Sequence, residues 1–124
     1  MSDFLKKFGE EIKKNVPGYI AVAVSEIKSG ISYYSDSALA GFDPELASAF
    51  NLEVVKAKLN AINALGLNER IDDIMITMTN QIHIIDVSDN NEYFIYLAVD
   101  STKANLGMTK ALLGKYKKEI AGKL

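Results

Sequence analysis

The sequence predicts an α/β fold of the α+β type, in which a five-stranded, mostly antiparallel sheet carries helices on both faces. Residues 19–27 and 93–99 are apolar in both alternation phases, whereas a strand with one face in water would be polar at every second position. Helical periodicity recurs at both ends and in the middle of the chain, and short turns join the β-rich runs. Both sheet faces must therefore be covered, most simply by the long central helix on one and the two terminal helices on the other.

An amphipathic helix opens the chain and runs to about residue 15. Its apolar positions recur at helical spacing with lysines on the other side, at Phe4, Leu5, Phe8 and Ile12. Pro17 and Gly18 end it. The β-rich run 19–27 then turns at Ser29-Gly30 into the short run 31–35, which predicts a hairpin whose second strand lies at a sheet edge.

The central helix has clear start and stop signals, because Asp43 suits the N-cap, Pro44 suits the first turn and Gly66 suits the end. Three β-rich runs joined by short turns follow as a meander, over 72–79, 82–88 and 93–99. A helix over 105–124 closes the chain. The predicted order is helix, two strands, helix, three strands, helix.

The composition indicates one soluble domain over residues 1–124, with the cytoplasm as its expected location. The chain has no cysteine, and no run approaches the roughly 18 apolar residues that a membrane span needs. A net charge of -2 argues against nucleic-acid binding. The charge is uneven, since residues 1–14 and 105–124 together carry +5 and residues 15–104 carry -7. The uneven charge is explained by two solvated helix surfaces. It is also explained by a molecule with a basic side and an acidic side, which steer different partners.

The central helix is apolar on two sides that lie about 160° apart at 100° per residue. One stripe is rich in alanine and comprises Leu46, Ala47, Phe50, Val54, Ala57, Ala61, Ala64 and Leu65. The second stripe comprises Leu52, Val55, Leu59 and Ile62. One stripe can face the sheet, and the other, if left in water, would mark an interface. A second copy of the chain is the economical cover, although the loop 34–42 or a terminal helix could also provide it.

The run 72–79 has the composition of an edge strand, where a strand of another molecule can add. If it lies beside the central helix, one two-fold contact could pair both elements and extend the sheet across two chains. An obligate contact of this kind buries on the order of 2,000 Å² or more. The predicted homodimer interface therefore comprises the second stripe, Leu52, Val55, Leu59 and Ile62, together with Asp73, Met75 and Thr77.

Motifs for catalysis, cofactors and metals are missing. The Gly-Lys pairs at 114 and 122 lie in a helical pattern and lack the spacing of a phosphate-binding loop. His83 is the sole histidine and lies within an apolar strand, which favours a structural role. Asp72, Asp73 and Asp86 could converge as a carboxylate cluster, although acids at strand ends usually deter edge aggregation. We therefore predict no catalytic residue, cofactor or metal, and a protein that is not an enzyme.

The order of elements and several short segments resemble the roadblock family, the dynein light-chain type with many bacterial and archaeal members. The resemblance spans essentially the whole chain, and lysine stands at 110 where bacterial members usually have arginine. The segments that carry it are 16–20, 29–30, 74–77, 97–100 and 104–107.

The resemblance implies the profilin-like roadblock fold and a homodimer formed through the central helix and third strand. It also implies a scaffold or regulator of a small Ras-like GTPase, or a subunit of a larger assembly, with the GTPase supplying the nucleotide site. The resemblance does not identify a residue that would act as a catalytic finger toward the GTPase. Arg70 is the only arginine and is therefore the one candidate by residue type. The alternative from another class is a small-molecule sensor of the PAS type, against which the heavily apolar filling of the sheet argues.

Overall fold

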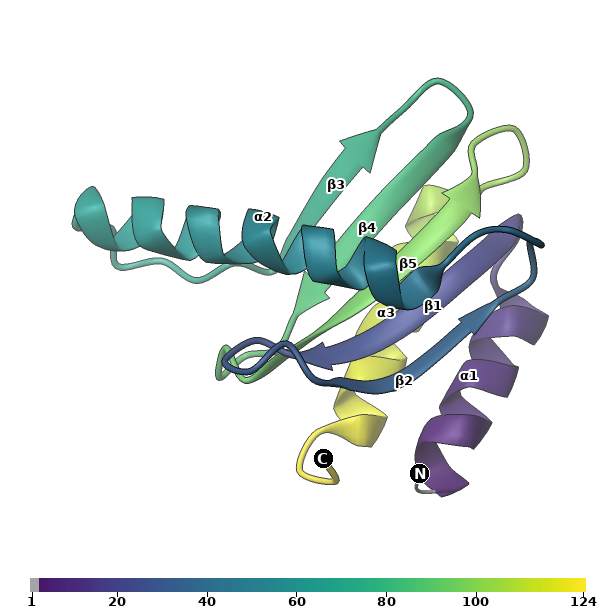
Figure 1. The fold of residues 1–124 in the computed structure, drawn as a ribbon, viewed down its shortest axis with the longest axis horizontal. Helices are drawn as coiled ribbons and strands as arrows, with labels where there is room; N and C mark the ends of the chain where they lie inside the picture. Colours follow the sequence, from purple (N-terminus) through teal and green to yellow (C-terminus); the bar gives the residue numbers. More distant parts are fainter. Residues whose placement is uncertain (1–2) are drawn as a thin grey trace.

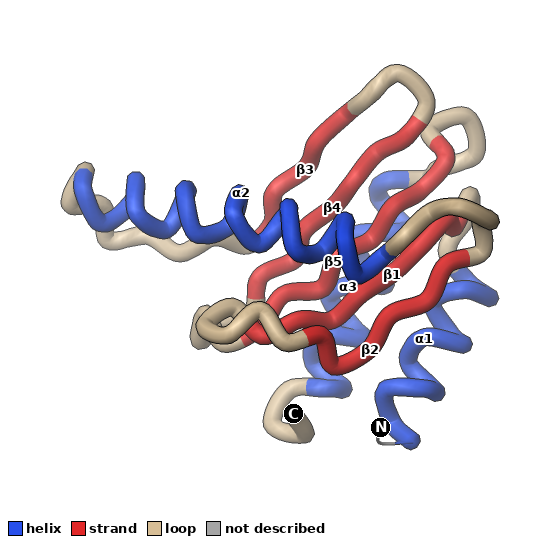
Figure 2. The backbone as a smooth tube through the Cα atoms, viewed as in Figure 1, coloured by secondary structure: helices blue, strands red, loops and turns tan. Residues whose placement is uncertain are grey.

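The computed structural model describes residues 3–124, which form three helices and five strands in the predicted order (Figure 2). No helix in this part of the chain is both long and apolar enough to cross a membrane. The elements are α1 (Asp3–Asn15), β1 (Tyr19–Glu26), β2 (Ser32–Ser37), α2 (Pro44–Ala64), β3 (Asp73–Thr77), β4 (Gln81–Val87), β5 (Tyr93–Asp100) and α3 (Leu106–Ile120).

The five strands form one antiparallel sheet in the order β2-β1-β5-β4-β3. The predicted hairpin and meander are confirmed, and β2 and β3 are the two edge strands. The most apolar strands, β1 and β5, lie at the centre, where each is buried on both faces. The local pattern of apolar residues thus determines which strands become central.

Helices cover both faces, as the sequence predicts (Figure 1). On one face, α1 and α3 pack through Phe8, Ile12, Leu113 and Tyr116 against strand residues that include Val22, Ile84 and Leu97. On the other face, α2 lies alone and crosses the strands (Figure 1). Among residues 3–124, no further layer lies above the outer side of α2.

Small side chains let α2 lie close to the sheet. Ala21, Ala23 and Ala98 point toward α2 and are fully buried. Beside them, the Oγ atoms of Ser25 and Ser48 form a buried hydrogen bond of 2.7 Å that ties β1 to α2. On β1, the opposite face carries the larger Val22 and Val24, which pack toward α1 and α3.

The two longer helices begin at the caps that their sequences suggest. The Asp43 side chain accepts hydrogen bonds from the backbone N–H groups of Glu45 and Leu46, and the Asn105 side chain accepts one from that of Met108. The last helix is shorter than predicted, because α3 ends at Ile120 and Gly122 has a φ of +79°. A left-handed glycine conformation is a common helix terminator.

Candidate functional site

The α2 helix has two apolar stripes, but the stripe that faces solvent is not the one predicted to form an interface. Leu52 and Val55 are buried against the sheet of their own chain, at 8% and 0% exposure. Leu59 and Ile62 are partly buried on the same side. Leu52 and Val55 therefore belong to the core of one chain and not to an uncovered stripe, whereas an interface role for Leu59 and Ile62 stays a prediction. Ala21, Ala23 and Ala98 of the sheet leave room beneath the helix for these branched side chains.

The solvent-facing stripe of α2, hereafter the outer stripe, is strongly exposed at several large side chains. It comprises Leu46, Phe50 and Val54; Phe50 is 69% exposed and Leu46 is 56% exposed, while Val54 is also open to solvent. Large apolar side chains grouped in this way on one helix face are typical of an interaction surface. Helical periodicity in the sequence identified both stripes of α2. It did not show which stripe faces the sheet, because that depends on Ala21 and Ala23 of β1, which accept the larger side chains of α2.

The far end of α2 extends beyond the sheet (Figure 1). The helix crosses the β3 edge, and its last turns lie past that edge, where the returning segment 65–72 runs beside them. Leu65 and Leu67 in this overhang are exposed, and Leu59 and Ile62 are incompletely covered. The overhang thus leaves apolar surface where the sheet of its own chain ends.

The predicted interface residues of β3 lie on the other face of the sheet. Asp73, Met75 and Thr77 share the α1–α3 side, because Ile74 and Ile76 alternate with them and pack toward α2. Met75 packs against the core, Asp73 forms an ion pair of 3.2 Å with Lys110, and only Thr77 is exposed. The structure therefore does not gather their side chains with those of α2. The element that lies beside the overhang is the unpaired backbone edge of β3.

The two sheet edges differ in how well they are protected. On β2, Asp36 accepts a hydrogen bond of 2.6 Å from the Tyr19 hydroxyl, and a bulge breaks the register with β1 between Val24 and Ser25. Charges and bulges of this kind discourage pairing with another strand. On β3, the pairing with β4 is regular from Asp73 to Thr77. The β3 edge is the better template for an added strand.

The three acids considered as a carboxylate cluster do approach one another. Asp73 and Asp86 are register partners on β3 and β4, but Lys110 and Lys117 neutralise them, and Arg70 lies 3.8 Å from Asp72. Burial raises the pKa of Asp86, and the hydrogen bond from Lys117 opposes that rise. No group of side chains in residues 3–124 has the composition and spacing to hold a metal ion.

The sole histidine has structural contacts. A ring nitrogen of His83 lies 3.1 Å from the Tyr96 hydroxyl and the other lies 2.8 Å from Gln81 Oε1. The Phe42 ring meets the imidazole edge-on, with centroids 6.3 Å apart. Burial lowers the His83 pKa, so the neutral ring is favoured in this setting. These contacts agree with the structural role that the sequence predicts for this residue.

Arg70 is exposed and held by two long contacts, at 3.8 Å to Asp72 and 3.9 Å to Asp89. It lies in the segment that returns from the overhang toward β3. Such an exposed pair contributes little to stability. The Arg70 side chain is accessible to solvent. It lies close to the β3 edge, so a partner that adds a strand at that edge would meet it.

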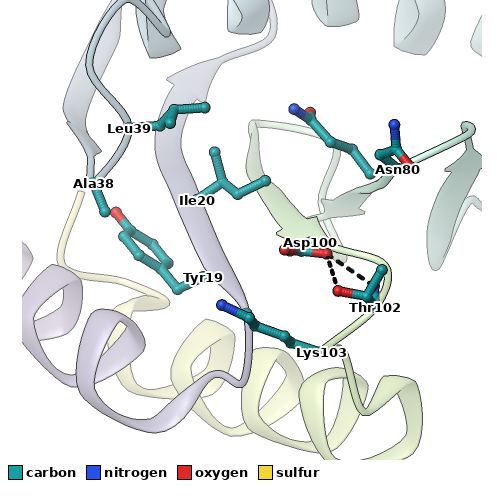
Figure 3. Close-up of a pocket in the computed structure, with 10 residues that line it drawn as sticks. Tyr19, Ile20, Ala38, Leu39, Asn80, Asp100, Thr102 and Lys103 are labelled. Carbon is teal, nitrogen blue, oxygen red and sulfur yellow. Dashed lines mark hydrogen bonds between the residues drawn. The ribbon is translucent and has the colours of Figure 1, made fainter.

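A hollow of about 430 Å³ lies at one end of the sheet, where four turns meet (Figure 3). Asp100 closes one wall, and its carboxylate accepts hydrogen bonds from the backbone and hydroxyl of Thr102 at 2.9 and 2.7 Å. Lys103, Asn80 and Leu39 line the rest. The hollow is open to solvent, and its polar groups do not converge on one point as they do in a ligand site (Figure 3).

Comparison with solved structures places this architecture among known folds. Myxococcus xanthus MglB superimposes with a TM-score of 0.81 and 14% identity, over 97% of this chain and 88% of that one. The gliding protein MglB of Thermus thermophilus gives 0.78 and 17%, over 96% and 87%. A Roadblock/LC7 domain of Streptomyces avermitilis gives 0.77 and 8%, over 92% of each chain.

The chain has the roadblock fold. The similarity lies in structure, since no family model matches the sequence and no curated protein does either. The order of elements and the division of helices between the two faces are those predicted from the sequence. Within residues 3–124, the outer stripe of α2, the α2 overhang and the β3 edge are surfaces that no other element covers, and the β2 edge is also unpaired.

Proposed function

We propose that this protein is a homodimeric regulator or scaffold for a small Ras-like GTPase, without catalytic chemistry of its own. The observation that carries the proposal is the α2 helix, which keeps an exposed apolar outer stripe and projects past the edge of its own sheet. Two uncovered surfaces on one helix suit two contacts. One would be a second copy of the chain, and the other would be the partner.

The second copy would pair along β3. Antiparallel pairing of β3 with its symmetry mate would continue the sheet and place the α2 overhang above the partner's strands. Leu59, Ile62 and Leu65 would then be covered by a sheet that their own chain does not supply. The predicted β3 residues Asp73, Met75 and Thr77 would line this junction, whereas Leu52 and Val55 already belong to the core of one chain.

The GTPase would bind the outer stripe of α2. In the proposed dimer, both α2 helices lie on the same face of the continuous sheet and form one apolar platform. Resemblance to the roadblock family and likeness to the MglB structures support this class of partner. The missing phosphate-binding motif is consistent with a chain whose partner supplies the nucleotide.

A capture experiment tests the partner. Wild-type protein and the variants Phe50→Glu and Ala49→Glu are used as bait in native lysate, and the retained proteins are identified by mass spectrometry. Phe50 lies in the outer stripe, and Ala49 lies on the polar flank of the same helix and also faces solvent. The Ala49→Glu variant therefore controls for the added charge.

Wild type and Ala49→Glu are expected to retain a Ras-like GTPase. Phe50→Glu should retain at least about tenfold less of it, because the substitution removes an apolar anchor from the interface. Equal capture by all three baits would exclude the outer stripe as the binding surface. Absence of any GTPase from all three would contradict the proposed partner class.

A further inference from the structure

Exposed charges are distributed unevenly between the terminal helices and the rest of the described chain. The terminal layer, defined as α1 (residues 3–15) and α3 with its tail (106–124), exposes eight lysines and three acids. Four of these lysines lie on α1, three on α3 and one in the tail. The remaining described residues expose four basic and seven acidic side chains. The terminal layer is therefore net positive at +5 and the rest of the described surface net negative at -3, with Asp89 and Glu92 of the β4–β5 turn bordering Lys118.

The lysines of the terminal layer are mostly free of internal partners. Lys110 and Lys117 form ion pairs with Asp73 and Asp86 across the sheet edge, and Lys117 is largely buried. In residues 3–124, Lys14, Lys115 and Lys118 are outside every ion pair. Their charge is available to a ligand outside the molecule.

The two helices present these lysines together. A shallow groove of about 280 Å³ separates α1 from α3, with Lys7, Lys115 and Lys123 among its lining residues. The Lys123 ammonium lies 5.7 Å from the centre of the Phe4 ring, which joins the two ends of the chain on this side (Figure 1). Glu11 and Glu119 also line the groove and moderate its charge.

The proposed dimer would double this field. A two-fold axis that pairs β3 with β3 while keeping both α2 helices on one face must run perpendicular to the sheet. Both terminal layers then lie on the opposite face, side by side. This step rests on the proposed function, whereas the charge of each chain does not.

We propose that the terminal layer docks peripherally on an anionic lipid bilayer, with the outer stripe of α2 directed away from the lipid. Lysine is a mobile point charge that suits a fluid anionic surface, and this layer has no arginine, the residue favoured for fixed bidentate contacts to phosphate in nucleic acids. The apolar side chains Leu5, Phe8 and Ile12 of α1 are buried in the core, so the contact is electrostatic and does not involve insertion. The acidic remainder of the surface would be repelled and would orient the protein.

Vesicle co-sedimentation tests the proposal with the whole chain. The probes are phosphatidylcholine vesicles with and without phosphatidylglycerol, at low and high salt. The variant Lys14→Glu/Lys118→Glu alters the terminal layer, and Lys28→Glu/Lys58→Glu makes the same charge change elsewhere at exposed positions. Soluble polyglutamate serves as a competing probe, and light scattering of each sample reports the oligomeric state.

Wild type and the Lys28/Lys58 variant are expected to sediment with the anionic vesicles only, and binding is expected to fall as salt screens the charges. The Lys14/Lys118 variant should bind the anionic vesicles at least about tenfold more weakly than wild type. Equal loss in both variants, or equal binding to neutral vesicles, would overturn the proposal. Binding to polyglutamate without binding to vesicles would assign the layer to an acidic protein instead. A monomer that still binds anionic vesicles would contradict the proposed dimer and leave the bilayer contact supported.

Discussion

Thr109 places one unpaired polar atom in the core, which lowers the free energy of unfolding. The residue is fully buried on α3, and its hydroxyl has no hydrogen-bond partner within residues 3–124. A buried hydroxyl without a partner loses its bonds to water and gains none in return. The backbone amide of the same residue is satisfied by the Asn105 carbonyl, so the cost belongs to the side chain alone.

Replacing Thr109 with valine should stabilise the protein by about 1 kcal/mol, because the methyl group keeps the volume and the unpaired hydroxyl is removed. Thermal unfolding would show this as a rise of about 4 °C in Tm. Thr102→Val is the control, since that hydroxyl donates to Asp100 and its loss should give no gain. A lower Tm for Thr109→Val would show that the hydroxyl is satisfied in solution.

The pair Asp86–Lys117 is the residue-scale feature with a pH dependence. Burial raises the pKa of Asp86 in the folded protein. Protonation of Asp86 therefore adds to the free energy of unfolding at a pH below the ordinary pKa of aspartate, and this added stability is lost as the pH rises through the raised pKa. Lys117 offsets the cost of the carboxylate at neutral pH through a contact of 2.8 Å. Lys117→Met should therefore cost about 3 kcal/mol at neutral pH.

This cost should shrink in acid, because Asp86 becomes neutral and no longer needs the lysine. Urea unfolding of wild type and Lys117→Met across the acidic range measures the difference. Asp86→Asn/Lys117→Met should recover much of the lost stability, since no buried charge remains. A penalty independent of pH would show that Lys117 acts through packing.

At the scale of elements, the distance between α2 and the sheet depends on the small residues beneath the helix. Ala23 is fully buried between two strands and under α2. Ala23→Leu should force the helix outward and lower the free energy of unfolding by about 2 kcal/mol, as overpacking does. Ala49→Leu is the control, because Ala49 is exposed on the same helix. Equal stability of the two variants would show that α2 has room beneath it.

Element types and their order followed from periodicity, caps and turn residues. Asp43 and Pro44 correctly placed the start of α2, and the continuous apolar runs at residues 19–27 and 93–99 correctly indicated a sheet covered on both faces. Which stripe of α2 faces the sheet could not be read from the helix alone, because both stripes are apolar. That choice depends on the surface offered by Ala21, Ala23 and Ala98, which lie far away in the sequence.

At the scale of the whole molecule, the uncovered surfaces form a consistent arrangement. The β3 edge is regular and open, α2 extends past it, and the β2 edge is blocked by a bulge and an acid. Pairing through β3 would cover the overhang and leave the outer stripe for a partner. The sequence alone indicated an interface at α2 and the third strand, whereas the overhang required the crossing angle that tertiary packing sets.

The homodimer is the central claim, and a solution mass tests it most directly. Sedimentation equilibrium should give twice the 13.6 kDa chain mass for wild type at micromolar concentration. Leu65→Glu, at an exposed overhang position, should raise the dimer dissociation constant at least about tenfold, whereas Ile31→Glu beside β2 should leave it unchanged. A wild-type protein that stays at 13.6 kDa at high micromolar concentration would contradict the account.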